Sequence, residues 1–162
     1  MKKVTIIGSG NIGLSLAKGL VKSEFAHAAD ITLTRRNLNA LAEEASRGFS
    51  VSNDNKTAVQ GADIVVFAIL PQQLKKVLLE VAPVIEKTNQ IFVSIVSGVS
   101  CADLKAELGE DATVIRAMPN TAIAIGQSMT CIASDNASDD SLKEVENMFE
   151  SVGSVVVINE DL

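Results

Sequence analysis

Six residues near the N-terminus have the composition and spacing of a turn that binds a dinucleotide. Gly8, Gly10 and Gly13 form G-x-G-x-x-G between a short β-branched run and residues with helical apolar spacing. In such a turn the first glycine permits a sharp bend, the second lets a pyrophosphate approach the backbone, and the third lets the helix pack on the strand. The helix start then offers unpaired N–H groups to the phosphates. The pattern predicts a dinucleotide site made by Gly8, Ser9, Gly10, Asn11, Ile12 and Gly13.

The end of the next predicted strand indicates which dinucleotide this turn would bind. An NAD site commonly has an acidic residue about 20 residues after the turn, where it bonds the ribose 2′-hydroxyl. No Asp or Glu lies between Ile31 and Ala42, and Arg35 and Arg36 occupy the place instead. Two guanidinium groups suit a 2′-phosphate, which accepts bidentate charge-assisted hydrogen bonds. We therefore predict NADP(H) as the cofactor, with NAD(H) as an alternative and a solvated arginine pair as the other interpretation.

The elements that would position these residues alternate between strand and helix along the whole chain. Apolar β-branched runs indicate strands, and apolar residues three and four apart indicate helices. Residues 63–70 are almost wholly apolar, as in a strand buried on both faces of a parallel sheet. We predict strands at 3–7, 31–34, 49–52, 63–70, 90–95, 113–117, 129–133 and 154–158, and helices at 12–20, 38–45, 71–81, 101–108 (capped by Ser100) and 142–152 (with capping-box spacing from Ser141 to Glu144).

This alternation predicts an α/β fold, namely a Rossmann-type, doubly wound and mostly parallel sheet with helices on both faces. A length of 162 residues is typical of one domain. It is too short for a dinucleotide domain together with a full substrate domain. We therefore expect residues 1–162 to form a single NAD(P)-binding domain.

Composition and charge exclude several other classes of protein. The formal net charge is −6, without the basic stripe of a nucleic-acid binder. Aromatic residues make up 3% and include neither Trp nor Tyr, so a platform for stacking bases is also lacking. The apolar runs are far shorter than the ~20 residues of a membrane-spanning helix. We predict a cytoplasmic protein that binds neither nucleic acid nor membrane.

The cysteine, histidine and acidic residues give no pattern for metal binding or nucleophilic catalysis. Cys101 and Cys131 lack metal-ligand spacing, and two buried, reduced thiols are the expected state. The single histidine, His27, is expected in a surface loop. No metal site is predicted, and no catalytic residue is assigned. A group of acids fits a solvated helix start better than a calcium loop, and comprises Asp135, Asp139, Asp140, Glu144 and Glu146.

Further loops would meet the glycine turn at one edge of the predicted sheet. Ligands of open α/β sheets bind at the carboxyl ends of the strands, and the strands at 63–70 and 90–95 end at that edge. The strand at 113–117 also ends there and leads into Pro119-Asn120-Thr121, which offers an amide and a hydroxyl to a ligand. Taken singly, each of these loops is better explained by ordinary turn chemistry.

The loop sequences together resemble a known enzyme family. The most specific is VIRAMPNT at 114–121, followed by Gly126 and Met129-Thr130, with shorter segments at 97–100 and 55–56. Over nearly the whole chain these residues are similar to pyrroline-5-carboxylate reductase, which reduces a cyclic imine to proline with NAD(P)H. The resemblance implies an NADP(H) site lined by Asn55, Ala68, Ile69, Leu70, Pro71, Ile95, Val96, Ser97, Asn120 and Thr121, the last two near the nicotinamide.

The resemblance also implies what this chain would do and what it would lack. It implies an oxidoreductase of proline biosynthesis whose small-molecule substrate is a cyclic imino acid. The family has a second, helical domain that forms the dimer and supplies most substrate contacts, and no part of this sequence corresponds to it. We therefore expect cofactor binding without appreciable turnover, a homo-oligomer only with that domain, and exposed apolar surface on the final strand.

Two departures from the family pattern keep other functions open. Leu70 stands where the family has lysine, and Ala122 stands where it has proline. One alternative is another NADP-dependent oxidoreductase with the same N-terminal fold, such as a hydroxyacid dehydrogenase or a deazaflavin-dependent NADP reductase. The other is a non-catalytic NADP-binding module that acts by contacting a partner.

Overall fold

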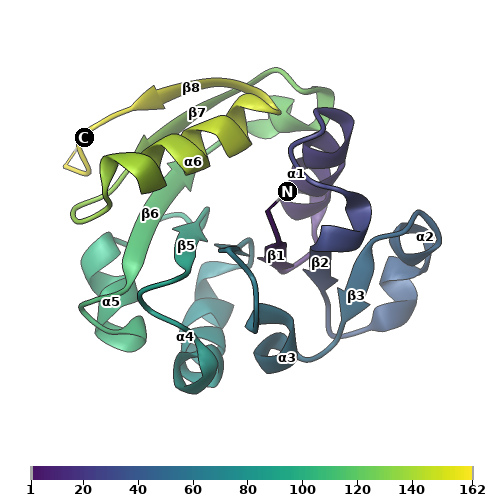
Figure 1. Ribbon diagram of the computed structural model, residues 1–162, viewed down its shortest axis with the longest axis horizontal. Coiled ribbons are helices and arrows are strands. Elements are labelled where there is room, and N and C mark those ends of the chain that lie inside the picture. Colours follow the sequence, from purple (N-terminus) through teal and green to yellow (C-terminus); the bar gives the residue numbers. More distant parts are fainter. Residues whose placement is uncertain (1, 162) are drawn as a thin grey trace.

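One eight-stranded sheet, flanked by helices, organises the computed structural model, which describes residues 2–161 (Figure 1). The strand order is β3-β2-β1-β4-β5-β6-β7-β8. The first six strands are parallel, β7 is antiparallel to β6, and β8 is parallel to β7. The strands are β1 (Val4–Ile7), β2 (Ile31–Thr34), β3 (Ser50–Ser52), β4 (Ile64–Phe67), β5 (Ile91–Ser94), β6 (Thr113–Met118), β7 (Ser128–Ala133) and β8 (Gly153–Val157).

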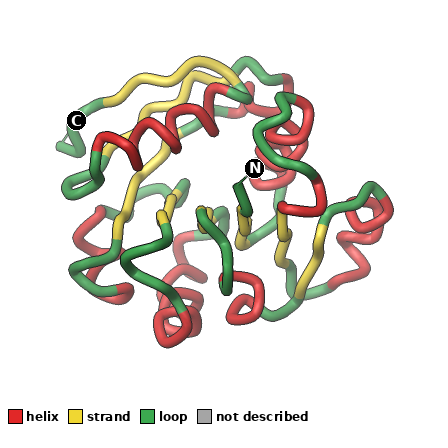
Figure 2. Tube along the Cα trace, viewed as in Figure 1, coloured by secondary structure: helices red, strands yellow, loops and turns green. Residues whose placement is uncertain are grey.

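Helices cover both faces of the sheet, as Figure 2 shows in red against the yellow strands. This confirms the predicted Rossmann-type fold. Within residues 2–161, no helix is long and apolar enough to cross a membrane. The α-helices are α1 (Asn11–Lys22), α2 (Ala42–Ser46), α3 (Asn55–Val59), α4 (Pro71–Val81), α5 (Cys101–Leu108) and α6 (Asp139–Glu150), and the 3₁₀-helices are η1 (Ala28–Asp30), η2 (Leu38–Leu41), η3 (Ala82–Val84) and η4 (Thr121–Ile125).

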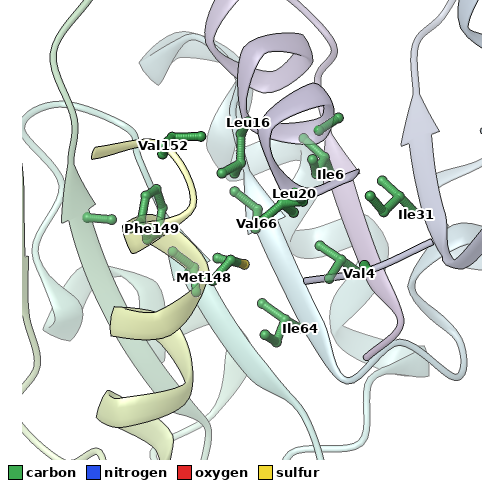
Figure 3. Close-up of a cluster of buried hydrophobic side chains, with 14 of the residues drawn as sticks. Val4, Ile6, Leu16, Leu20, Ile31, Ile64, Val66, Met148, Phe149 and Val152 are labelled. Carbon is green, nitrogen blue, oxygen red and sulfur yellow. The ribbon is translucent and has the colours of Figure 1, made fainter. Parts of the chain in front are cut away.

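Two apolar cores, one on each face, follow from the alternation of side chains along the strands. Ile6 points into the core beneath α1 and α6, while its neighbour Ile7 points into the core beneath α4 and α5. Figure 3 shows the first core, in which α1 and α6 pack together on the central strands. Its labelled members are Val4, Ile6, Leu16, Leu20, Ile31, Ile64, Val66, Met148, Phe149 and Val152.

The structure corrects several of the predicted elements. Residues 38–41, predicted as the start of an α-helix, form the 3₁₀-helix η2 ahead of α2. Helix α3 was not predicted, because its five residues are too few to show a helical period. Helix α6 begins at Asp139 rather than after Ser141, because the Ser138 hydroxyl caps it by accepting from the Ser141 N–H at 3.1 Å. The strand predicted at 63–70 ends at Phe67, where the chain leaves the sheet to form the turn into α4.

The last strand exposes apolar side chains, as the sequence predicted. Strand β8 lies at the edge of the sheet, and the side chains of Val156 and Val157 are 45% and 50% exposed. Met129 on the adjacent strand β7 and Met118 on β6 are also exposed. An unpaired strand edge with apolar side chains can pair with another chain.

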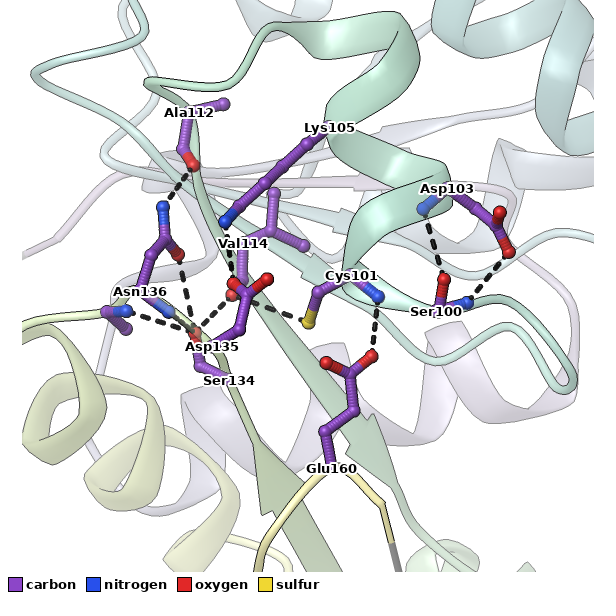
Figure 4. A network of polar contacts seen from close by, with 11 residues as sticks. Ser100, Cys101, Asp103, Lys105, Ala112, Val114, Ser134, Asp135, Asn136 and Glu160 are labelled. Carbon is purple, nitrogen blue, oxygen red and sulfur yellow. Dashed lines mark hydrogen bonds and ion pairs between the residues drawn. The ribbon is translucent and has the colours of Figure 1, made fainter.

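A polar network joins α5 to the loop before α6 and to the chain after β8 (Figure 4). The buried Lys105 ammonium lies 2.6 Å from the Asp135 carboxylate, so Asp135 is ion-paired and not simply part of a solvated helix start. The Glu160 carboxylate accepts from the Cys101 backbone N–H at 2.6 Å, and Arg116 lies 3.6 Å away. These contacts fix the chain after β8 against the start of α5.

The two free cysteines differ in burial. Cys101 is fully buried beside this network, whereas Cys131 is only partly buried, which corrects the prediction of two buried thiols. Strand β7 exposes one face, so alternation brings Cys131 toward that face. His27 is exposed between α1 and β2, as predicted.

Cys101 gives a pH-dependent prediction. Burial, and after it the charge of Glu160 and Asp135, raises the pKa of the Cys101 thiol from 9.0 to about 11. Below the unfolded value the thiol is neutral in both states; above it the unfolded chain ionises first, so stability falls as pH rises toward the folded value. We expect the urea midpoint to fall more steeply between about pH 9 and 11 in the wild type than in Cys101→Ala. Parallel slopes in the two proteins would contradict this.

Candidate functional site

The glycine turn lies where the strand order reverses. Strand β1 ends at Ile7 and pairs with β2 on one side and β4 on the other, so the chain that leaves β1 emerges at the switch point of the sheet. This is where open α/β sheets bind their ligands. The turn runs from Gly8, with φ +88°, to Gly10, which is the N-cap residue of α1 with φ −81°.

The three glycines of the turn meet different surroundings. A Cβ atom at Gly8 would lie 2.5 Å from the Ala68 carbonyl oxygen, and one at Gly13 would lie 2.5 Å from the Gly8 carbonyl oxygen. These distances are too short for a real side chain, so the backbone there is closely packed. A Cβ at Gly10 would meet nothing within 4 Å. Open space therefore lies in front of the second glycine only.

Unpaired backbone donors border that open space. The first backbone bond of α1 runs from the Leu14 N–H to the Gly10 carbonyl at 2.9 Å, so the N–H groups of residues 11–13 have no acceptor inside the helix. No acidic side chain lies in the first turn of α1. A helix start of this kind carries a partial positive charge. The turn therefore fits a pyrophosphate group in both shape and charge.

The end of β2 lies against the turn. Thr34 accepts from the Gly8 N–H through its hydroxyl at 3.3 Å, and its carbonyl accepts from the Ser9 hydroxyl at 3.0 Å. The Arg35 guanidinium donates to the Ser9 carbonyl at 3.2 Å, and Arg36 is exposed. Sequence reasoning did not identify Thr34, because a threonine at the end of a strand has no distinguishing pattern.

The predicted loops after β4 and β5 come to the same edge, but not all of their side chains face the open side. The Ala68 N–H donates to Ile7 and the Ile95 N–H donates to Phe67, so both loops continue the sheet beside the turn. The Val96 side chain is buried in the core beneath α5, so only its backbone could face a ligand. The side chains of Ala68, Ile69 and Ile95 pack partly against the two cores, whereas Leu70, Pro71 and Ser97 are exposed.

The loop after β6 reaches the start of α1. The Asn120 side chain caps η4 by accepting from the Ala122 N–H at 3.1 Å, and the Asn120 N–H donates to the Ser128 hydroxyl at 3.3 Å. Thr121 is exposed. A groove of about 340 Å³ runs along the junction of α1 and η4 and is lined by Asn11, Ile12, Leu14, Ser15, Lys18, Thr121, Ile123 and Ala124.

Asn55 lies in the short segment before β4. It is the first residue of α3, which Asp54 caps by accepting from the Lys56 N–H at 3.0 Å. The Thr57 hydroxyl donates to the Asp54 carboxylate at 2.8 Å and is the main cause that lowers the pKa of that carboxyl. Asn55 itself is half-buried. Residues 2–161 contain no cluster of His, Cys, Asp and Glu suited to a metal ion.

Comparison with known proteins places the chain in a family. Residues 3–98, more than half of the chain, match the family model described as NADP oxidoreductase, coenzyme F420-dependent. The chain belongs to this family. The matched region contains the glycine turn, the end of β2, α3 and the loops after β4 and β5. The loop after β6, with Asn120 and Thr121, lies outside it.

The similarity to pyrroline-5-carboxylate reductases covers nearly all of this chain and confirms the resemblance found in the sequence. Pyrroline-5-carboxylate reductase 1 of Dictyostelium discoideum is 36% identical over 98% of the chain and 31% of its own length. The enzyme of Staphylococcus haemolyticus is 32% identical, over 98% of the chain and 59% of its own length.

A solved structure agrees with these relatives. The pyrroline-5-carboxylate reductase of Coxiella burnetii superposes with a TM-score of 0.92 at 27% identity, over 97% of this chain and 58% of that protein. The chain thus spans between 31% and 59% of the length of these relatives. The similarity covers the part of each protein that corresponds to the glycine turn, the sheet and its edge.

Proposed function

We propose that this chain is the NADP(H)-binding part of an oxidoreductase that resembles pyrroline-5-carboxylate reductase. The observation that carries the proposal is the Gly10 position, where open space borders unpaired N–H groups at the switch point of the sheet. The similarity to pyrroline-5-carboxylate reductases supports the enzyme class, and the family description supports NADP as the dinucleotide.

Each part of the sheet edge has a proposed role toward the cofactor. Bound NADPH would supply the hydride that reduces the carbon–nitrogen double bond of a cyclic imino acid. The backbone around Gly10 would hold the pyrophosphate, and the end of β2, which carries Arg35 and Arg36, would lie at the 2′-phosphate. Asn55, the turn at 68–71 and the tip at 95–97 would flank the dinucleotide. Asn120 and Thr121 would lie beside the nicotinamide, in the loop that packs against α1.

The residues along this edge of the sheet would position and enclose the cofactor, and none of them is given a chemical step in the reaction. Gly8 and Gly13 lie so close to the neighbouring backbone that a Cβ at either position would clash, and a preset geometry lowers the barrier for transfer between bound reactants. Leu70, which is 57% exposed, contributes apolar surface at this edge and no charge. We further propose a small-molecule substrate and a cytoplasmic location, which the two free thiols support.

Titration of the purified chain with NADPH, NADH and NADP⁺ tests the cofactor assignment. We expect saturable binding of NADPH, tighter than that of NADH. Two charge-assisted hydrogen bonds that are partly exposed would favour NADPH by roughly 30-fold or more. Equal affinities would remove the 2′-phosphate role given to the end of β2, and no binding of either dinucleotide would overturn the proposal.

Addition of 1-pyrroline-5-carboxylate to the NADPH complex tests the proposed substrate and whether this chain alone reduces it. We expect little or no consumption of NADPH, because this edge of the sheet forms one wall of a site and hydride transfer needs an enclosed, aligned substrate. Rapid reduction of the imine by these 162 residues would contradict that expectation. Reduction of an oxo acid in preference to the imine would favour a hydroxyacid dehydrogenase instead.

A further inference from the structure

Three hydrogen bonds connect the end of β2 to consecutive residues of the glycine turn. The Gly8 N–H donates to the Thr34 hydroxyl, the Ser9 hydroxyl donates to the Thr34 carbonyl, and Arg35 donates to the Ser9 carbonyl, at 3.3, 3.0 and 3.2 Å. Ser9 and Thr34 are each 2% exposed. Their polar groups therefore depend on each other rather than on water, and the turn is held from the side of β2.

The hydrogen bond from Arg35 to the Ser9 carbonyl affects Gly10, the residue proposed to bind the pyrophosphate. The Ser9 carbonyl and the Gly10 N–H belong to one planar trans peptide unit, so they point in opposite directions. A donor that holds the Ser9 carbonyl thus also sets the direction of the Gly10 N–H. Gly10 is the position where a Cβ would meet nothing within 4 Å.

Arg36 is in a different situation, although it is the adjacent residue and has the same charge. It is exposed, and within residues 2–161 its side chain takes part in no hydrogen bond or ion pair. Its five donors are therefore available to a ligand. One of the donors of Arg35 is already engaged with the turn.

We propose that the two arginines divide the work: Arg35 is a positioning residue that orients the phosphate-binding turn, and Arg36 alone selects for the 2′-phosphate. This inference rests on the proposed function, because it assumes that the turn holds a dinucleotide pyrophosphate. NADPH and NADH share the pyrophosphate and differ only in the 2′-phosphate. Loss of Arg35 therefore weakens both cofactors by the same factor, whereas loss of Arg36 changes their ratio.

Two matched variants, Arg35→Gln and Arg36→Gln, test this by calorimetric titration with NADPH and with NADH. We expect Arg35→Gln to weaken both cofactors about fivefold, the effect of one modest hydrogen bond, with an unchanged ratio. We expect Arg36→Gln to weaken NADPH about tenfold and to leave NADH within about twofold. Both side chains are exposed, so neither variant should unfold the chain.

A second measurement, made without cofactor, tests the positioning role directly. In amide NMR spectra of the free chain, Arg35→Gln should shift the Gly10 N–H resonance, and Arg36→Gln should leave it in place. A loss of NADPH affinity alone in Arg35→Gln, or an unshifted Gly10 resonance, would overturn the inference. If the wild type binds neither cofactor, the proposed function fails, and the Gly10 resonance still decides whether Arg35 orients the turn.

Discussion

Gly10→Val is expected to weaken the binding of NADPH and of NADH by at least about 100-fold, which corresponds to ~2.7 kcal/mol. The added side chain would project into the open space before the start of α1, where a Cβ meets nothing within 4 Å. It would occupy the space through which the pyrophosphate has to approach the backbone. Binding should therefore fall without any clash inside the protein itself.

The fold of the Gly10 variant should remain intact. Gly10 has φ −81°, which is ordinary for any L-residue. The remaining cost is that of a poorer N-cap residue, about 1 kcal/mol or less. Urea unfolding of the wild type, Gly10→Ala and Gly10→Val would show this, and the binding loss should grow from alanine to valine. Wild-type affinity in the valine variant would place the phosphates somewhere else.

The local structure of the glycine turn and of strand β4 could be predicted from the sequence, because each sequence pattern is compatible with few backbone conformations. The three glycines follow a β-branched run and precede apolar residues with helical spacing. This arrangement predicts a strand, a tight turn and a helix, and the structure has all three. Residues 64–67 are buried on both faces of the sheet, as an uninterrupted apolar run requires. In each case local chemistry and the global fold agree.

Other features depend on contacts between segments that lie far apart in the chain. The direction of the Arg35 side chain depends on where the Ser9 carbonyl points, 26 residues away in the sequence. The burial of Val96 and the partial exposure of Cys131 depend on which helices cover which strands. Composition and periodicity contain no information on such contacts. Tertiary packing decides them, and it separates residues that look equivalent in the sequence, such as Arg35 and Arg36.

The largest loss of stability is expected from Gly8→Ala, at about 3 kcal/mol, with a fall in Tm of roughly 6–12 °C. Two causes add together. Gly8 has φ +88°, a conformation that costs an L-residue about 1–2 kcal/mol. The new Cβ would also lie 2.5 Å from the Ala68 carbonyl, so the end of β4 would have to move away from the turn.

Gly61→Ala is the matched control, because it separates these two causes. Gly61 also has positive φ, at +78°, but a Cβ there would meet nothing within 4 Å. It should therefore show only the backbone term, about 1–2 kcal/mol. Equal losses at the two positions would mean that β4 yields easily to the new methyl group. A larger loss at Gly8 would mean that the close contact between the turn and β4 is rigid, and this rigidity is what holds the backbone donors at Gly10 in place before a cofactor arrives.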